Sequence, residues 1–259
     1  MIIDPSYADL ALTGILILAV LYLSHREHLE IGRTYIHASI RAVVQLILVG
    51  YVIEYVFRLD RWYLVALLLT AMSFVAAHEG ARRFPGKIGY AAGMVWVSIF
   101  AGTFINTFVV TEVILKIEPW WSPRYLLPLA GMIMGNALNS GSLAGERFVS
   151  DFRSRIAEVE THLTLGFSSA HAVREIKRNA VRSALIPTFN AMFTVGIVHL
   201  PGMMTGQILS GSSPLTATKY QIIVMFMISS TVALTALILI HLLKRRIFTA
   251  AEQIRYDLI

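Results

Sequence analysis

The chain has 259 residues, of which 56% are apolar and 15% are charged, and its mean hydropathy is +0.65. This combination excludes an ordinary soluble protein and indicates an integral membrane protein. The absence of cysteine excludes disulfide bonds and catalysis by a thiolate. The net charge of +6 does not indicate a nucleic-acid partner, because the basic residues flank apolar stretches, where positive charge marks the cytoplasmic side of a membrane.

Seven apolar stretches are long enough to cross a bilayer, which takes roughly 17 to 25 mostly apolar residues. The first stretch lacks the basic segment and the cleavage site of a signal peptide, so we expect it to be retained. The sequence therefore predicts an all-α, polytopic membrane protein with one transmembrane domain over residues 1–259. The predicted spans are 7–24, 34–57, 62–78, 88–115, 125–145, 183–206 and 219–243.

The Lys and Arg residues predict the orientation of these spans. Of the 22 in the chain, 17 fall beside the first, third and fifth connections and the carboxyl terminus, and five fall on the opposite side. Because positive charge is enriched in the cytoplasm, we expect the amino terminus outside and the carboxyl terminus inside. We expect the chain to lie in the plasma membrane, the inner membrane of a bacterium, in contact with the lipid bilayer.

Two stretches depart from simple spans. The stretch 88–115 is longer than a straight crossing needs, so it is expected to tilt or to begin in the interface. The stretch 199–214 is dense in Gly, Pro and Ser, and it is either an external loop or a broken, re-entrant segment. A broken segment would line a cavity, because irregular backbone at membrane depth needs polar partners.

A polar segment of 37 residues, 146–182, separates the fifth and sixth spans. Its first half has apolar residues every three or four positions, which predicts an amphipathic helix that continues the fifth span into the cytoplasm. Gly166 is expected to end this helix, and Ser168 or Ser169 to begin a second helix that enters the sixth span. We call this predicted helix, glycine turn and helix the corner. It is either a handle on which a cytoplasmic motor protein pushes or a solvated connector.

The corner also carries a short motif. The spacing of Glu160, Gly166 and Ile176 is similar to the coupling loop of bacterial ATP-driven importers, in which a glycine follows a glutamate by six residues and an isoleucine follows ten later. The match departs from that pattern at Thr161 and His162, where the importers have alanine, and no Leu-Pro follows closely after Ile176. The candidate residues for coupling to an ATPase are Glu160, Gly166, Ser168, Ser169, Val173 and Ile176.

Longer motifs resemble the FetB family, the iron-export permeases of bacterial ABC transporters, which are related to plant half-transporters of aluminium tolerance. The likeness runs nearly from end to end of the chain. It is carried by residues 41–46, 49–52, 128–137, 182–188, 195–196, 200–206 and 219–221. The resemblance implies that the whole chain is the permease subunit of an ATP-driven exporter of a metal ion such as iron. It also implies a homodimer of permeases and a cytoplasmic ABC ATPase subunit as partner.

The sequence agrees that the motor is a separate protein. It contains no phosphate-binding loop of the form Gly-x4-Gly-Lys-Ser/Thr, so we expect no enzyme activity and no cofactor in this chain, with ATP and Mg²⁺ bound by the partner ATPase. Three alternatives stay open: a secondary transporter driven by an ion gradient, an ABC permease for a non-metal substrate such as a nucleotide sugar, and a membrane scaffold that binds anionic lipid headgroups.

Polar residues and methionines inside the predicted spans are candidates for a substrate path, because polar groups are costly to place in lipid. Those on the fifth span surround Gly131-x3-Gly135, a pattern that equally allows two helices to pack closely. The two glutamates near the outer ends of spans either bind a cation at the exit or are solvated at the interface. Thioethers suit softer ions than iron(II), so methionine alone does not indicate iron. The candidates are Met132, Met134, Asn136, Asn139, Met203, Met204, Glu54 and Glu112.

Overall fold

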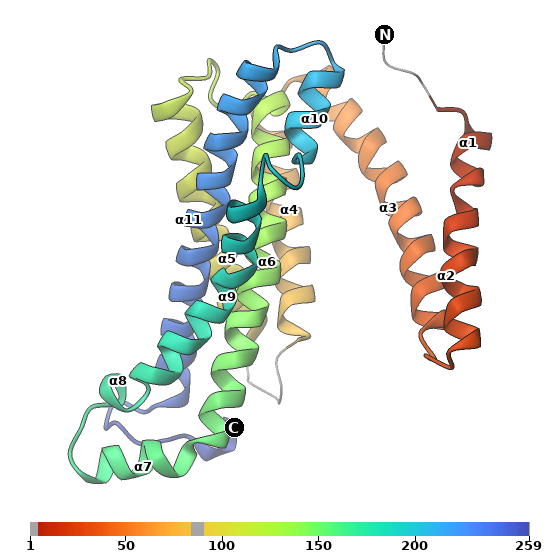
Figure 1. Cartoon of the computed structure of the whole chain (residues 1–259). Coiled ribbons are helices and arrows are strands. Elements are labelled where there is room, and N and C mark those ends of the chain that lie inside the picture. Colours follow the sequence, from red (N-terminus) through yellow and green to blue (C-terminus); the bar gives the residue numbers. More distant parts are fainter. Residues whose placement is uncertain (1–4, 84–90, 259) are drawn as a thin grey trace. The chain divides into compact units, whose positions relative to one another are not determined.

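The computed structural model describes residues 5–83 and 91–258. Over these residues every regular element is a helix, which confirms the all-α prediction (Figure 1). The chain divides into two compact units, Met1–Arg61 and Trp62–Ile259, and each is described by itself. One transmembrane domain across the whole chain stays a prediction.

The first unit is a helical hairpin. It contains α1 (Tyr7–Leu12), α2 (Gly14–Arg26) and α3 (Gly32–Leu59), and α2 packs against α3. Among its described residues only Ser24 and Val56 are buried within the unit. Nearly all of its apolar side chains therefore point outward, as the side chains of membrane-spanning helices do.

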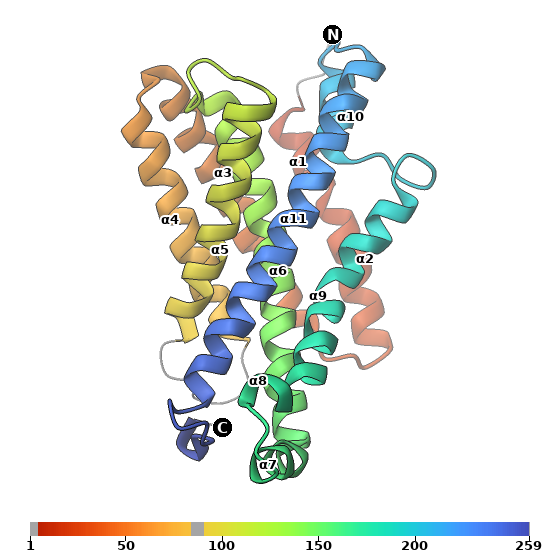
Figure 2. The ribbon, with the colours of Figure 1, turned by 90° about the vertical axis from the view of Figure 1, so that its left-hand side faces the viewer.

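The second unit is a bundle built around α6, which contacts α4, α5, α9 and α11 (Figure 2). The interior is formed by small and apolar residues of these helices, and Phe148 and Phe152 of α6 are fully buried. The elements of this unit are α4 (Trp62–Ala81), α5 (Ala91–Phe108), the π-helix η1 (Val109–Ile114), α6 (Pro123–Ser154), α7 (Ile156–Thr164), α8 (Ser169–Ala172), α9 (Arg174–Thr194), α10 (Gly202–Leu209), α11 (Pro214–Ile247) and the 3-10 turn η2 (Tyr256–Leu258).

In the described part of the chain, five helices are long and apolar enough to cross a membrane. They correspond to the first, second, third, fourth and seventh predicted spans; the start of the predicted span 88–115 lies outside the described residues. These helices are Ala8–Arg26, Gly32–Leu59, Trp62–Ala81, Ala91–Ile114 and Pro214–Ile247. By length and composition α6 and α9 do not join them, because α6 carries many Gly, Ser and Asn residues and α9 begins with charged ones.

The predicted sixth span 183–206 is wrong at its end, because α9 stops at Thr194. Gly196 has a φ of +79°, and its N–H donates to the carbonyl of His199 at 3.0 Å, so the chain turns here instead of continuing as a helix. A second helix, α10, starts after Pro201 and packs against α11. Residues 199–214 therefore contain a short helix after a turn, and the external loop and the re-entrant segment both stay predictions for this stretch.

Candidate functional site

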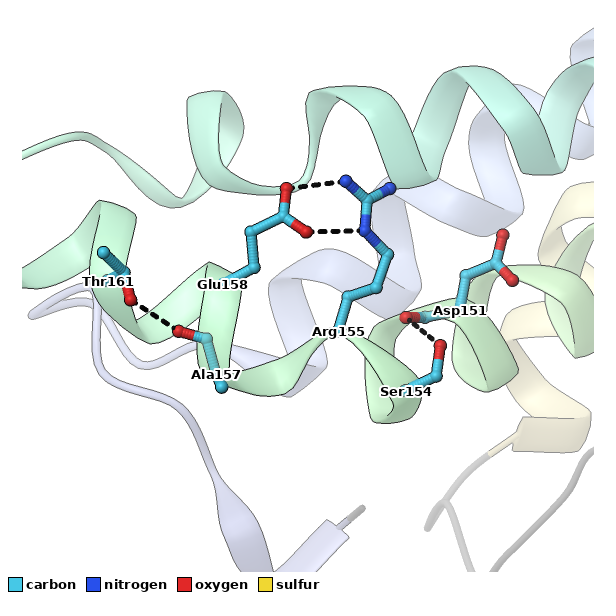
Figure 3. Close-up of polar contacts among 6 residues, drawn as sticks. All are labelled: Asp151, Ser154, Arg155, Ala157, Glu158 and Thr161. Carbon is cyan, nitrogen blue, oxygen red and sulfur yellow. Dashed lines mark hydrogen bonds and ion pairs between the residues drawn. The ribbon is translucent and has the colours of Figure 1, made fainter.

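The corner is present, but its first helix is not continuous with α6. The break falls at Arg155, whose φ of −115° and ψ of 22° depart from helical values, while the Ser154 hydroxyl beside it donates to the Asp151 carbonyl at 3.0 Å (Figure 3). The Arg155 guanidinium donates two hydrogen bonds to the Glu158 carboxylate, at 2.7 and 2.6 Å. These bonds hold the pKa of Glu158 below its ordinary value, because they favour the charged form. The ion pair therefore joins the residue at the break to the first turn of α7 and stabilises the start of that helix.

The turn between α7 and α8 has the geometry that the sequence predicts. Gly166 lies in the left-handed region with a φ of +85°, and the Ser168 side chain accepts a hydrogen bond from the His171 N–H at 3.4 Å, so Ser168 caps α8. The α8 helix is a single turn, and α9 follows it directly. Pro187 lies inside α9, which continues past it to Thr194.

The six candidate coupling residues occupy two different environments. Ser169, Val173 and Ile176 are buried and fasten the corner to the bundle. Gly166 and Ser168 are exposed, as are the side chains of the adjacent Leu165 and Phe167, while Glu160 is half-buried in the middle of α7. An external partner would thus meet the turn, and the buried residues would transmit its motion to α9; these coupling roles stay predictions.

Two residues of the carboxy-terminal tail contact the corner, and neither was predicted. The Glu252 carboxylate accepts a hydrogen bond from the Ser169 N–H at 2.5 Å, and the Tyr256 hydroxyl donates to Glu160. They lie 83 and 96 residues from their partners along the chain, so no local pattern connects them.

Half of the predicted substrate-path residues meet at one cavity of about 420 Å³, formed by α6, the segment from α9 to α10, and α11. Met132, Asn136 and Asn139 come from α6, and Met203 comes from α10. His199, Gln221 and Met225 complete the polar and sulfur-bearing part of the lining, together with two hydroxyl side chains. Gln221 and Met225 were not predicted as path residues, because Gln221 lies beside Lys219 and Tyr220 at the polar start of α11 and Met225 lies within an apolar run of that helix.

The other four candidates do not line this cavity. Met134 lines a separate apolar cavity of about 250 Å³, and Met204 lines a neighbouring one on the α10 and α11 side. Glu112 is half-buried in η1. Glu54 belongs to the first unit, where its carboxylate pairs with Arg58 at 2.6 Å. A single path through all eight residues is therefore not formed within the second unit.

The α6–α11 cavity has no Asp, Glu, Lys or Arg among its described lining residues. The Asn136 amide donates to the Met132 carbonyl at 2.9 Å, whereas the Asn139 oxygen accepts from Arg83 at 3.3 Å. The Gln221 side-chain oxygen is buried and accepts no hydrogen bond from the described residues, a situation that costs about 1–3 kcal/mol. No group of three or more His, Asp or Glu residues able to hold a metal occurs in residues 5–83 or 91–258.

The helices, the cavity and the charged corner together define a class, the multi-pass helical membrane proteins. Within this class the chain belongs to the UPF0014 family, whose model, described as an uncharacterised protein family, matches residues 7–248. No solved structure matches the chain.

Relatives match along nearly their whole length. The chain is 38% identical to the UPF0014 membrane protein slr1647 of Synechocystis over 253 residues, 98% of each chain. It is 33% identical to the "Probable iron export permease protein FetB" of Escherichia coli, covering 95% of this chain and 93% of that one. It is 32% identical to the "Protein ALUMINUM SENSITIVE 3" of Arabidopsis thaliana, covering 93% and 87%. These matches agree with the resemblance found in the motifs.

Proposed function

We propose that this chain is the permease subunit of an ABC-type exporter, driven by a separate cytoplasmic ATPase. The observation that carries the proposal is the corner, a compact turn joined to two bundle helices through α7 and α9. A motor that moves the turn would move both helices, because Val173 and Ile176 are buried against the bundle. ATP and Mg²⁺ belong to the partner, and two copies of the permease would match two ATPase subunits.

The topology that we propose for this function has the seven spans predicted from the sequence. We propose that α6 and α9 cross the membrane beside the five apolar helices, since both pack along α11 in the bundle. Their polar residues then face protein or the cavity instead of lipid. With the amino terminus outside, the corner and the carboxy-terminal tail lie together in the cytoplasm.

The proposed cargo is a metal ion such as iron. This part of the proposal comes from the name of the Escherichia coli relative, a probable iron export permease, and the α6–α11 cavity is the candidate position for the cargo within the bundle. The absence of carboxylates from the described lining favours a second candidate, a non-metal cargo. A bare metal cation that entered this cavity would lose its hydration without gaining a counter-charge. The broken segment before α10 is also what an ion-coupled secondary transporter would use.

The test uses the full chain and its ATPase in liposomes. Asn136→Leu and Gln221→Leu are expected to slow ATP-driven transport about tenfold, the effect of losing roughly 1.4 kcal/mol of cargo binding, while ATPase binding is unchanged. Met134→Leu is the matched control, because Met134 lines the separate apolar cavity. Equal transport by all three variants would show that the cavity is not on the transport path. Transport by the chain without the ATPase would favour the secondary transporter.

A further inference from the structure

The carboxy-terminal tail, residues 248–258, is folded and packs against the corner. After α11 the chain reverses, and Phe248 pairs with Ile254 in an isolated antiparallel bridge. The Phe248 ring is buried and lies edge-on to Phe152 of α6, with ring centroids 5.7 Å apart. The Arg255 N–H donates to the Ile247 carbonyl at 2.8 Å, which returns the chain to the end of its own helix.

Two side chains of the tail hold the corner at points on either side of the glycine turn. Glu252 accepts from the Ser169 N–H, one of the unpaired donors at the start of α8, and Tyr256 donates to Glu160 in the middle of α7. Glu252 has a φ of +60°, a conformation that costs a non-glycine residue roughly 1–2 kcal/mol. The tail thus adopts an unfavourable backbone conformation that places its carboxylate on the corner.

A groove of about 940 Å³ runs between the corner and the tail. One wall is formed by residues from Glu160 to Ser168, and the other by Ala251 to Ile254 and Tyr256. Glu160 and Glu252 supply two carboxylates, and no Lys or Arg is among the described lining residues. Phe167 and Tyr256 are exposed beside them and offer aromatic surface. The groove is therefore acidic and aromatic on the side of the protein that carries most of its basic residues.

We propose that the tail and the corner form one composite docking surface for the ATPase subunit, in which the tail holds the turn in position and the groove takes a basic, partly apolar segment of the ATPase. We choose a basic segment as the occupant because the groove is lined by two carboxylates and by no Lys or Arg, so it attracts positive charge. The inference rests on the proposed function, since the ATPase is the partner proposed there.

The experiment measures the Kd between the detergent-solubilised full chain and its ATPase. The double variant Glu252→Ala, Tyr256→Phe is expected to raise the Kd at least about tenfold, or roughly 1.4 kcal/mol. Asp257→Asn is the matched control, because it removes a charge from the same tail outside the groove and is expected to leave the Kd within about twofold of wild type. Raising the salt concentration should weaken wild-type binding, since the contact is electrostatic.

A second measurement guards against misfolding. Hydrogen exchange of the Ser169 amide should accelerate in the double variant while exchange in α6 and α11 stays slow, which would show that only the tail has detached. A wild-type Kd in a variant whose Ser169 amide exchanges fast would overturn the composite surface, and so would unchanged exchange at Ser169. If the wild-type chain does not bind the ATPase at all, the proposed function fails together with this inference.

Discussion

Gly166 forms the turn of the corner for a conformational reason. Its φ of +85° is in the left-handed region, and a Cβ built on it would meet no atom within 4 Å, so the backbone, not space, demands glycine here. The sequence could indicate this residue because a glycine followed by a capping serine is a local signal. It could not indicate Glu252 or Tyr256, whose partners are far away along the chain.

Two substitutions at Gly166 distinguish a need for its left-handed backbone conformation from a need for glycine itself. Gly166→Val should destabilise the turn by about 1–2 kcal/mol, because a β-branched residue is disfavoured at positive φ, and ATPase stimulation should fall with it. Gly166→Asn should keep most of the stimulation, since asparagine tolerates this region. The measurement is ATP hydrolysis by the reconstituted complex. Equal losses in both variants would point to a need for glycine itself, and no loss in either would assign the turn no role.

The contact between Glu252 and Ser169 should respond to acid. Hydrogen bonds from Ser169, through its side chain and then its backbone N–H, lower the pKa of Glu252 below its ordinary value, and the charge of Lys244 acts in the same direction. The contact therefore contributes fully above the ordinary pKa of a glutamate and is lost as the pH falls through the lowered value. In this groove the neighbouring titratable groups are Glu160 and Tyr256.

Nuclear magnetic resonance can follow this titration at the Ser169 amide. The chemical shift of its amide proton should change with pH, with a midpoint below the ordinary pKa of a glutamate. This change should vanish in Glu252→Gln. A midpoint at or above that value would contradict the charged contact.

Among the elements, α5 and α11 pack most closely through small residues. A Cβ on Gly102 would lie 2.7 Å from Thr235 Oγ1 and 3.2 Å from the Thr231 carbonyl. The predicted close-packing pattern Gly131-x3-Gly135 on α6 is borne out only in part, because a Cβ on Gly131 would lie 3.3 Å from the Met72 Cε, whereas one on Gly135 would meet nothing within 4 Å.

Gly102→Ala should therefore push α5 and α11 apart and cost about 1–3 kcal/mol of stability. Gly93→Ala, in the same helix but with no atom within 4 Å of its Cβ, should be neutral or slightly stabilising. Thermal unfolding in detergent, followed by circular dichroism, compares the two. Similar unfolding temperatures for both variants would mean that the helices can separate without loss.

Helix positions could be predicted wherever one physical signal dominates. Long apolar stretches predicted five helices close to their observed bounds, and amphipathic periodicity predicted α7 and α9. The break at Arg155 could not be predicted because no Gly or Pro marks it in the sequence, and the end of α9 at Thr194 depends on the turn in which the Gly196 N–H donates to the His199 carbonyl. The cavity residues were only half found because α10 and α11 bring Met203 and Gln221 to α6 through tertiary packing.

At the scale of the whole molecule, the orientation can be tested directly because the chain has no cysteine. Each introduced cysteine is then the only one. A membrane-impermeant thiol reagent applied to intact cells should label Ser212→Cys, between α10 and α11, and should not label Ser154→Cys until the membrane is opened. Labelling of both from outside would contradict a single crossing by α9 and the proposed cytoplasmic corner.

The central claim is that a separate ATPase drives this permease through its corner. Its most direct test is the ATP-dependent movement of ferrous iron in liposomes that contain the chain with the corner facing outward, with and without the ATPase. Iron should accumulate only when both proteins and ATP are present, and Gly166→Val should abolish this accumulation. Accumulation by the chain alone under an ion gradient, with no response to the ATPase, would contradict it.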